Sequence, residues 1–214
     1  MVTLTTALEL SCLIIAAICL YQDKDATWRS MIVFLLFTCL IEFTGKIMRQ
    51  RHQDNNWIYN IYIIAEAGFT GAMYVNLIQQ YVRKYKLHVA AFLLLAGLYI
   101  YEVYIHGIYQ FNNVTTTVMS VVFVFYGLYF YYLLIKAPRH YKLNQHPDFW
   151  WVAGSLLFYY VTSVSTLYFA VFNTRVHKVF TYRHYSYMFF NTILYGCWSY
   201  SFICRYRQRK LIRS

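Results

Sequence analysis

The sequence is poor in charged residues and in proline. Only 13% of its 214 residues are charged, whereas a soluble domain carries about 25%. The only prolines are Pro138 and Pro147, so the long apolar stretches contain none of the residue that most strongly breaks helices. Hydrophobic residues make up 60% of the chain and aromatic residues 21%. These proportions exclude an ordinary water-soluble globule and indicate a membrane protein.

The apolar residues fall into seven blocks, each about as long as the roughly 20 residues that cross a bilayer as a helix. This pattern predicts an all-α fold, a polytopic transmembrane bundle of seven helices. The predicted helices cover 2–21, 30–48, 57–82, 88–108, 114–136, 150–172 and 187–204. Because the connecting segments are too short to fold alone, we expect residues 1–214 to form a single transmembrane domain.

The distribution of Lys and Arg predicts the orientation, because basic loops are retained on the cytoplasmic side of a membrane. With the N-terminus outside and the C-terminus in the cytoplasm, the inner segments hold 13 basic residues: Lys24, Arg29, Arg83, Lys84, Lys86, Lys136, Arg139, Lys142, Arg205, Arg207, Arg209, Lys210 and Arg213. The outer segments hold Lys46, Arg49, Arg51, Arg175, Lys178 and Arg183. We expect the inner loops to contact anionic lipids. Nucleic-acid binding is not expected, because these residues form no continuous patch on a soluble face.

The eight acidic residues divide by type between loops and helices. All four Asp (Asp23, Asp25, Asp54 and Asp148) fall in predicted loops, whereas the first four predicted helices carry one Glu each: Glu9, Glu42, Glu66 and Glu102. A carboxylate inside the hydrocarbon is costly unless it is paired, protonated or facing water, so such residues mark functional sites by default. In the expected topology all four Glu lie in the outer half of the membrane. They are placed to line one cavity that opens to the outside.

Two of these glutamates have a cation one helical turn away. Lys46 follows Glu42 by four residues, and His106 follows Glu102 by four. Such spacing places each pair on one helix face. The pairs are therefore either counter-charges that tune a ligand site or internal ion pairs that let the helices pack, and the sequence supports both readings equally.

Glu66 is the strongest candidate for a ligand- or proton-binding group. It has no cation within a turn, and Tyr62 and Tyr59 continue its face outward. The small residues around it are Ala65, Ala67, Gly68, Gly71 and Ala72. Small residues permit close approach of a neighbouring helix, so we expect Glu66 to point into a helix interface. Further polar stripes are expected on the last two helices, formed by Ser155, Tyr159, Thr162 and Thr166 and by Asn191, Tyr195 and Ser199.

No metal or other cofactor is expected. The outer histidines are His52, His106, His177 and His184, and no two of them share metal-ligand spacing on one helix. His88 and His106 lie 18 residues apart on one predicted helix, about 27 Å, too far apart to hold one haem. All five cysteines fall inside predicted spans, without a CxxC motif or an outer disulfide pair.

The signatures of known seven-helix receptors and of membrane enzymes are absent. The seventh predicted helix contains no Lys, which excludes a retinal Schiff base. Neither Gly-x-Ser-x-Gly nor His-Glu-x-x-His occurs. We therefore expect a binding protein rather than an enzyme, with a lipid-acting enzyme that uses dispersed carboxylates as an alternative.

One stretch of the sequence resembles a known group of proteins. From Glu42 through Trp57-Ile58-Tyr59-Asn60-Ile61-Tyr62 to Glu66, the chain is similar to small multi-helix inner-membrane proteins of Bacteroidota-type bacteria. No activity has been assigned to that group. The resemblance implies a location in the bacterial inner membrane.

The sequence as a whole predicts a seven-helix membrane protein that binds a small ligand or cation in an outward-facing cavity lined by Glu and Tyr. We expect it to act as a sensor or as a subunit of a complex. Since no soluble output domain is present, a signal would pass to a membrane or cytoplasmic partner protein. The alternatives are a proton- or cation-coupled transporter or channel, which needs polar residues that continue to the inner side, and a purely structural subunit.

Overall fold

The computed structural model describes residues 4–82, 85–137, 143–172 and 177–213 and is helical, without strands, over these ranges. They form seven α-helices and one 3-10 helix: α1 (Leu4–Leu20), α2 (Ala26–Gln50), α3 (Asn56–Gln79), α4 (Tyr85–His106), α5 (Asn113–Lys136), η1 (Leu143–Gln145), α6 (Pro147–Phe172) and α7 (His177–Arg213). The predicted all-α class is confirmed. The basic residues Arg83, Lys84, Arg139, Lys142 and Arg175, on which the predicted orientation partly depends, lie outside the described residues.

The predicted helix bounds hold to within four residues for the first six helices and are wrong for the seventh. Helix α7 has 37 residues and runs far beyond the predicted 187–204 at both ends. Its flanks are polar but contain neither Pro nor Gly, so nothing in them ends the helix. Hydropathy detects only the apolar part of a helix, and it therefore missed the polar ends of α7.

Four helical segments are long and apolar enough to cross a bilayer: α2, α3, residues 88–106 of α4, and α5. They identify the chain as a membrane protein. Helix α1 is apolar but has 17 residues, about 26 Å at 1.5 Å per residue, against a hydrocarbon core of about 30 Å. The spans predicted for α1, α6 and α7 stay predictions.

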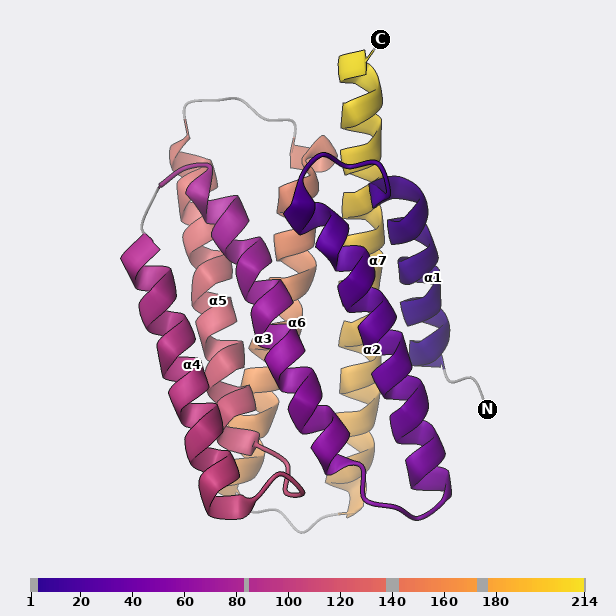
Figure 1. The fold of residues 1–214 in the computed structure, drawn as a ribbon, viewed down its shortest axis with the longest axis vertical. Coiled ribbons are helices and arrows are strands. Elements are labelled where there is room, and N and C mark those ends of the chain that lie inside the picture. The colour runs from indigo at the N-terminus through magenta and orange to yellow at the C-terminus, as the bar shows by residue number, and fades with distance from the viewer. Residues whose placement is uncertain (1–3, 83–84, 138–142, 173–176, 214) are drawn as a thin grey trace.

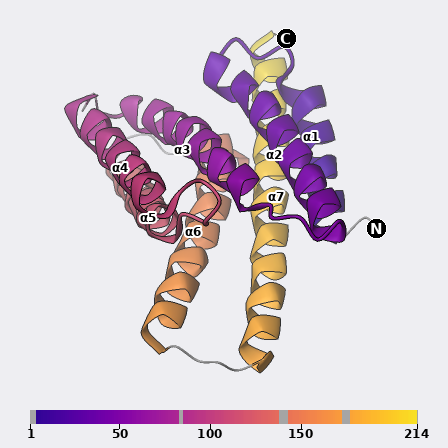
Figure 2. The same cartoon turned by 60° about the horizontal axis from the view of Figure 1, so that its bottom comes forward.

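The helices form a bundle in which α7 connects the two halves. Helix α1 packs on α2 and α7, α6 packs on α5 and α7, and α3 packs on α2 and α5, whereas α4 packs mainly on α5 (Figure 1). The C-terminal part of α7 projects past the other helices at the end of the bundle that also holds the α1–α2 connection (Figure 1). We call this the C-terminal end and the opposite one the α2–α3 end. Toward the α2–α3 end, α6 and α7 diverge (Figure 2).

An aromatic layer fills the middle of the bundle. The indoles of Trp151 and Trp198 stack with centroids 5.6 Å apart, and Tyr74 meets Trp151 edge-on at 5.2 Å. Trp198 also donates a hydrogen bond to the hydroxyl of Ser155, at 3.0 Å. Trp151 and Tyr74 are fully buried. Helices α6 and α7 can approach this closely because residue 154 is glycine: a Cβ there would lie 2.8 Å from the Cβ of Cys197.

Candidate functional site

A cavity of about 220 Å³ lies between α2, α3, α5, α6 and α7. Its lining includes Tyr59 near the start of α3 and Asn113 at the start of α5, so it reaches the α2–α3 end of the bundle. The polar lining groups are the carboxylates of Glu42 and Glu66, the phenols of Tyr59, Tyr62, Tyr159, Tyr187 and Tyr195, the hydroxyls of Thr116, Ser120, Thr162, Ser165 and Thr166, and the amides of Asn113 and Asn191. Over the described residues, its lining includes no Lys, Arg or His.

Glu66 is held in this cavity by a contact from another helix. The hydroxyl of Tyr159 on α6 donates a hydrogen bond to the Oε1 atom of Glu66, at 2.8 Å. Glu66 thus lies where α3 faces α6, and it lines the cavity there. Gly68, two residues further on and therefore on another face of α3, makes no close helix contact, because a Cβ there would meet nothing within 4 Å.

Tyr59 and Glu42 are brought together where α2 and α3 pack. A Cβ at Gly45 would lie 2.7 Å from the hydroxyl of Tyr59, so this glycine makes room for the phenol against α2. Glu42 lies one turn before Gly45 and lines the same cavity. Of the eight site residues expected from the sequence, Glu42, Glu66, Tyr59 and Tyr62 line the cavity together.

Glu9 and Lys46 lie beside the cavity rather than on its surface. Lys46 donates a hydrogen bond to the hydroxyl of Thr6, which ties α2 to α1. Glu9 is 5% exposed and experiences the charges of both Glu42 and Lys46. These two residues therefore form part of the α1–α2 contact behind the carboxylate of Glu42.

Glu102 and His106 belong to a different part of the molecule. The backbone N–H groups of Val114 and Thr115 donate to the two carboxylate oxygens of Glu102, at 2.9 and 2.6 Å. A carboxylate in this position satisfies unpaired donors and opposes the positive end of the dipole of α5. His106 is exposed at the end of α4. Because α4 packs mainly on α5, Glu102 does not line the cavity.

A buried amide organises the rim of the cavity. The side chain of Asn60 donates to the carbonyls of Ile108 and Gln110, both at 2.7 Å, and accepts from the N–H of Asn112 at 3.1 Å. These contacts attach the α4–α5 connection to α3, with Phe111 from the same connection in the cavity lining. Sequence analysis did not identify Asn60 as a site residue, although an Asn within an apolar helix is a signal for such a role.

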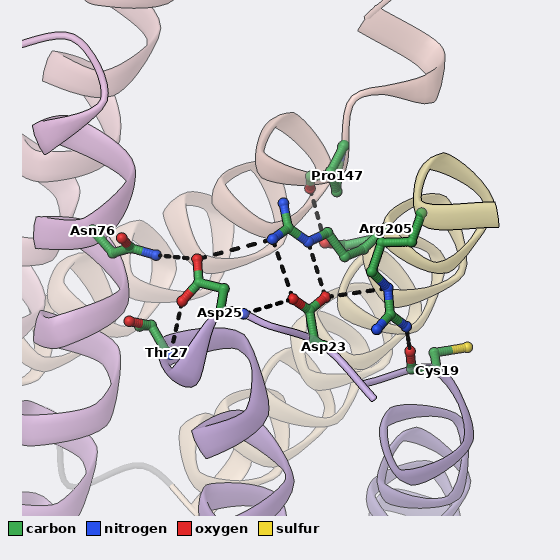
Figure 3. Close-up of polar contacts among 9 residues, drawn as sticks. Cys19, Asp23, Asp25, Thr27, Asn76, Pro147 and Arg205 are labelled. Atoms are coloured by element: carbon green, nitrogen blue, oxygen red, sulfur yellow. Dashed lines mark hydrogen bonds and ion pairs between the residues drawn. The ribbon is translucent and has the colours of Figure 1, made fainter. Parts of the chain in front are cut away.

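A second polar cluster, also missed by sequence analysis, lies at the C-terminal end (Figure 3). The carboxylate of Asp23, whose side chain is 1% exposed, receives Arg205 Nε at 3.0 Å and Arg209 Nε at 3.4 Å. Arg205 also lies 3.9 Å from Asp25 and 5.3 Å from the ring centre of Trp28. The cluster joins the α1–α2 connection to α7, whose basic residues had been assigned only to topology and lipid contact.

Neighbouring groups extend this C-terminal cluster to α1, α3 and α6. Arg209 donates a hydrogen bond to the carbonyl of Cys19, and Asn76 donates to Asp25 at 3.0 Å. Ser201 donates to the carbonyl of Pro147 at 2.8 Å. Asp148 was expected in a loop, but Pro147 begins α6, and Asp148 is buried in its first turn. Proline suits that first helical position because its missing N–H would have had no partner there.

The pKa values of the two buried aspartates Asp23 and Asp148 are shifted in opposite directions. Both lie outside the predicted spans. Burial acts to raise the pKa of Asp23, but hydrogen bonds from Arg205 and the N–H of Asp25, with the charges of both arginines, lower it below its usual value. Burial raises the pKa of Asp148 to about 6, and the charge of Arg205 only partly opposes this. The pKa values of Asp23 and Asp148 are therefore shifted in opposite directions within one cluster.

The described residues contain no group of three or more His, Cys, Asp or Glu side chains placed to hold a metal ion. No family model, curated protein sequence or solved structure matches the chain.

Proposed function

We propose that this protein is a seven-helix integral protein of the bacterial inner membrane that binds a small ligand or cation in a cavity open to the outside. It acts as a sensor or as a subunit of a membrane complex. The observation that carries this proposal is the cavity itself, which places Glu42 and Glu66 among five tyrosines without a lining Lys, Arg or His over the described residues. Intramembrane carboxylates that face a cavity mark ligand or ion sites.

Support for the orientation comes from the basic residues. Lys24 follows α1, Lys136 ends α5, and the last turns of α7 carry Arg205, Arg207, Arg209 and Lys210, all at the C-terminal end. Since basic segments are retained in the cytoplasm, the α2–α3 end faces outward, and the cavity with it.

Support for sensing rather than transport comes from the layer below the cavity. Phe34 and Trp198 line it, and the fully buried Trp151 and Tyr74 follow toward the C-terminal end. A transport path needs polar groups that continue across this layer. Helix α7 instead offers a mechanical connection, because it lines the cavity from Tyr187 to Trp198 and carries Arg205 in the opposite cluster. A partner protein that contacts the C-terminal end of α7 would receive the signal.

The orientation is tested by labelling introduced cysteines in intact cells with a membrane-impermeant maleimide. Asn113→Cys lies at the exposed start of α5, and Arg207→Cys lies at the exposed opposite end of α7. We expect labelling of the first and protection of the second until the cells are opened. The unsubstituted protein is the background control, because its five cysteines are buried or half-buried. The reverse pattern would place the cavity on the cytoplasmic side and contradict the proposal.

Transport is tested by flux in liposomes. The purified protein is reconstituted with a pH-sensitive dye inside, and a proton or K⁺ gradient is applied. We expect no flux above that of protein-free vesicles. Flux that disappears in the Glu66→Gln variant would replace the sensor proposal with a transporter.

A further inference from the structure

We propose that the ligand of this cavity is a small organic ammonium ion, held by the carboxylates of Glu42 and Glu66 and by the faces of the surrounding aromatic rings. This inference rests on the proposed function, because it assigns a chemical class to the ligand of the same cavity. It is carried by the charge of the lining, by the connected aromatic walls and by the size of the cavity.

The charge of the lining selects a cation. Glu42 experiences the charges of Lys46 and Arg49, neither of which lines the cavity. Glu66 is bonded to the neutral phenol of Tyr159. The remaining polar lining groups are neutral amides and hydroxyls. A buried carboxylate without a counter-charge is costly. Over the described lining, Glu66 has a neutral phenol and no cation beside it, so a cationic ligand supplies its counter-charge, whereas an anion is repelled by both carboxylates.

Aromatic rings form two connected walls of the cavity. In the first, the ring centre of Phe34 lies 6.2 Å from those of both Tyr62 and Trp198, and Trp198 lies 6.1 Å from Tyr195. All four residues line the cavity, and they come from α2, α3 and α7. An ammonium group is attracted to the electron-rich face of Trp, Tyr or Phe, and the attraction is strongest where water is excluded.

The second wall stands on α6 and α7. Phe158 lies 5.3 Å from Tyr159 and 5.9 Å from Tyr187, again between ring centres, and all three line the cavity. Tyr159 is also the donor to Glu66. One carboxylate is thus joined directly to an aromatic wall, which allows a single cationic group to meet both at once.

The ligand set suits an organic cation better than a metal ion. Ca²⁺ takes six to eight oxygen ligands, and Mg²⁺ needs near-octahedral geometry. Over the described residues, no third His, Cys, Asp or Glu accompanies the two glutamates. The cavity of about 220 Å³ corresponds to about seven waters at about 30 Å³ each. This is below the range of about 300–1,000 Å³ for drug-sized ligands, so the ligand is about as small as choline.

The test compares choline with its uncharged carbon isostere, 3,3-dimethylbutan-1-ol, by titration calorimetry on the full chain in nanodiscs. The two probes share shape and differ in charge. We expect choline and tetramethylammonium to bind at least about tenfold more tightly than the isostere, since a desolvated cation–π contact alone supplies that factor. Glu66→Gln is expected to weaken choline binding by at least about tenfold, and Glu42→Gln and Tyr62→Leu in the same direction.

The matched control is Glu102→Gln, which changes a buried glutamate outside the cavity and is expected to bind choline as the unsubstituted protein does. If Glu66→Gln fails to fold, Glu42→Gln and Tyr62→Leu carry the same test. Failure of the ammonium inference and failure of the binding proposal are distinguishable. Binding of the isostere or of butyrate as tight as that of choline, and lost when Ser165→Trp fills the cavity, would overturn the first and retain the second. Absence of binding by ammonium, neutral and anionic probes alike would overturn both.

Discussion

Both ends of the bundle hold carboxylates, but the groups around these carboxylates differ. Glu42 and Glu66 come from α2 and α3 at one end, whereas Asp23 and Asp25 come from the α1–α2 connection at the other, with Asp148 of α6 nearby. At the C-terminal end, the chain itself brings Arg205 to both aspartates, whereas the cavity lining includes no Lys, Arg or His among the described residues. A buried acid in direct contact with an arginine ties two elements together, while one that lines a cavity remains available to the ligand proposed above.

The C-terminal cluster also joins two segments that are far apart in the sequence. Asp23 and Arg205 are 182 residues apart, and their contact fixes the first connection of the bundle against its last helix. The cavity has a comparable long-range contact in Tyr159 and Glu66, 93 residues apart, but that contact is a single hydrogen bond to a neutral group. The ion pairs described here thus lie at the C-terminal end, and the proposed binding groups lie toward the opposite end.

The largest expected effect is the loss of the cation that pairs Asp23. Arg205→Met leaves the buried Asp23 carboxylate with Arg209 as its remaining cation among the described residues and the N–H of Asp25 as a neutral donor. Removing one partner of a buried ion pair costs about 3–5 kcal/mol, and we expect about 3 kcal/mol, because 26% of the Arg205 side chain is exposed. Chemical unfolding in detergent measures the difference. Arg207→Met, an exposed neighbour on the same helix, is the control and should change stability by less than about 0.5 kcal/mol. Equal stability of the two variants would contradict a structural role for the cluster.

The pH dependence of stability that comes from Asp148 is expected to be intermediate in size. Burial raises the pKa of Asp148 from 3.8 to about 6, so its contribution to folding is complete below the unfolded pKa and is lost as the pH rises through about 6. Between pH 5 and pH 8 this lowers the free energy of unfolding by about 1.4 kcal/mol. Asp148→Asn should remove that decrease in pH-dependent melting curves. An unchanged slope in the variant would show that Asp148 is ionised in the folded protein throughout this range.

The stability contributed by Asp23 changes with pH in the opposite direction to that contributed by Asp148. Burial opposes ionisation, but the hydrogen bonds and charges of its partners lower its pKa. Its contribution to stability is therefore present above the unfolded pKa of about 3.9 and is lost as the pH falls through the lowered value. In the Asp23→Asn variant, the free energy of unfolding should therefore fall less steeply as the pH is lowered below 5. Above pH 5, its pH dependence should still come from Asp148.

The smallest effect is expected at Glu102. It is a glutamate like the cavity acids, but like Asp23 and Asp25 its carboxylate is bound by groups of the chain itself. Glu102→Ala removes the acceptor for the N–H groups of Val114 and Thr115 and should cost about 1 kcal/mol, as for the loss of a helix cap. Thermal unfolding measures this cost, and choline titration should be unaffected. A variant with normal stability but weakened choline binding would return Glu102 to the ligand site.

The parts of the site that sequence predicted share one property: they depend on residue type and spacing along one helix. Glu66, Tyr62 and Tyr59 were expected on one face, and Tyr159, Thr162 and Thr166 on another, because residues three or four apart are neighbours on a helix. These residues do line the cavity. The exclusion of Glu102 could not be predicted in this way, because spacing does not say which helix a face meets.

The C-terminal cluster was missed for a related reason. Asp23 and Asp25 stand in a short polar connection, which is the usual place for solvated aspartates. Their burial depends on α7, which continues about two turns beyond its apolar segment and carries Arg205 and Arg209 back over that connection. A prediction from hydropathy places the end of a helix where the residues become polar. It therefore gave no reason to pair these aspartates with the arginines of α7.

Composition and periodicity by themselves determined that this chain is an all-helical membrane protein and that its glutamates lie within helices, because the cost of placing polar backbone and charge in hydrocarbon constrains every span in the same way. Only the tertiary structure decided which acids share a cavity, which one caps a helix and which aspartates find arginines. Those outcomes depend on how helices rotate and cross, and packing between residues distant in the chain sets that geometry.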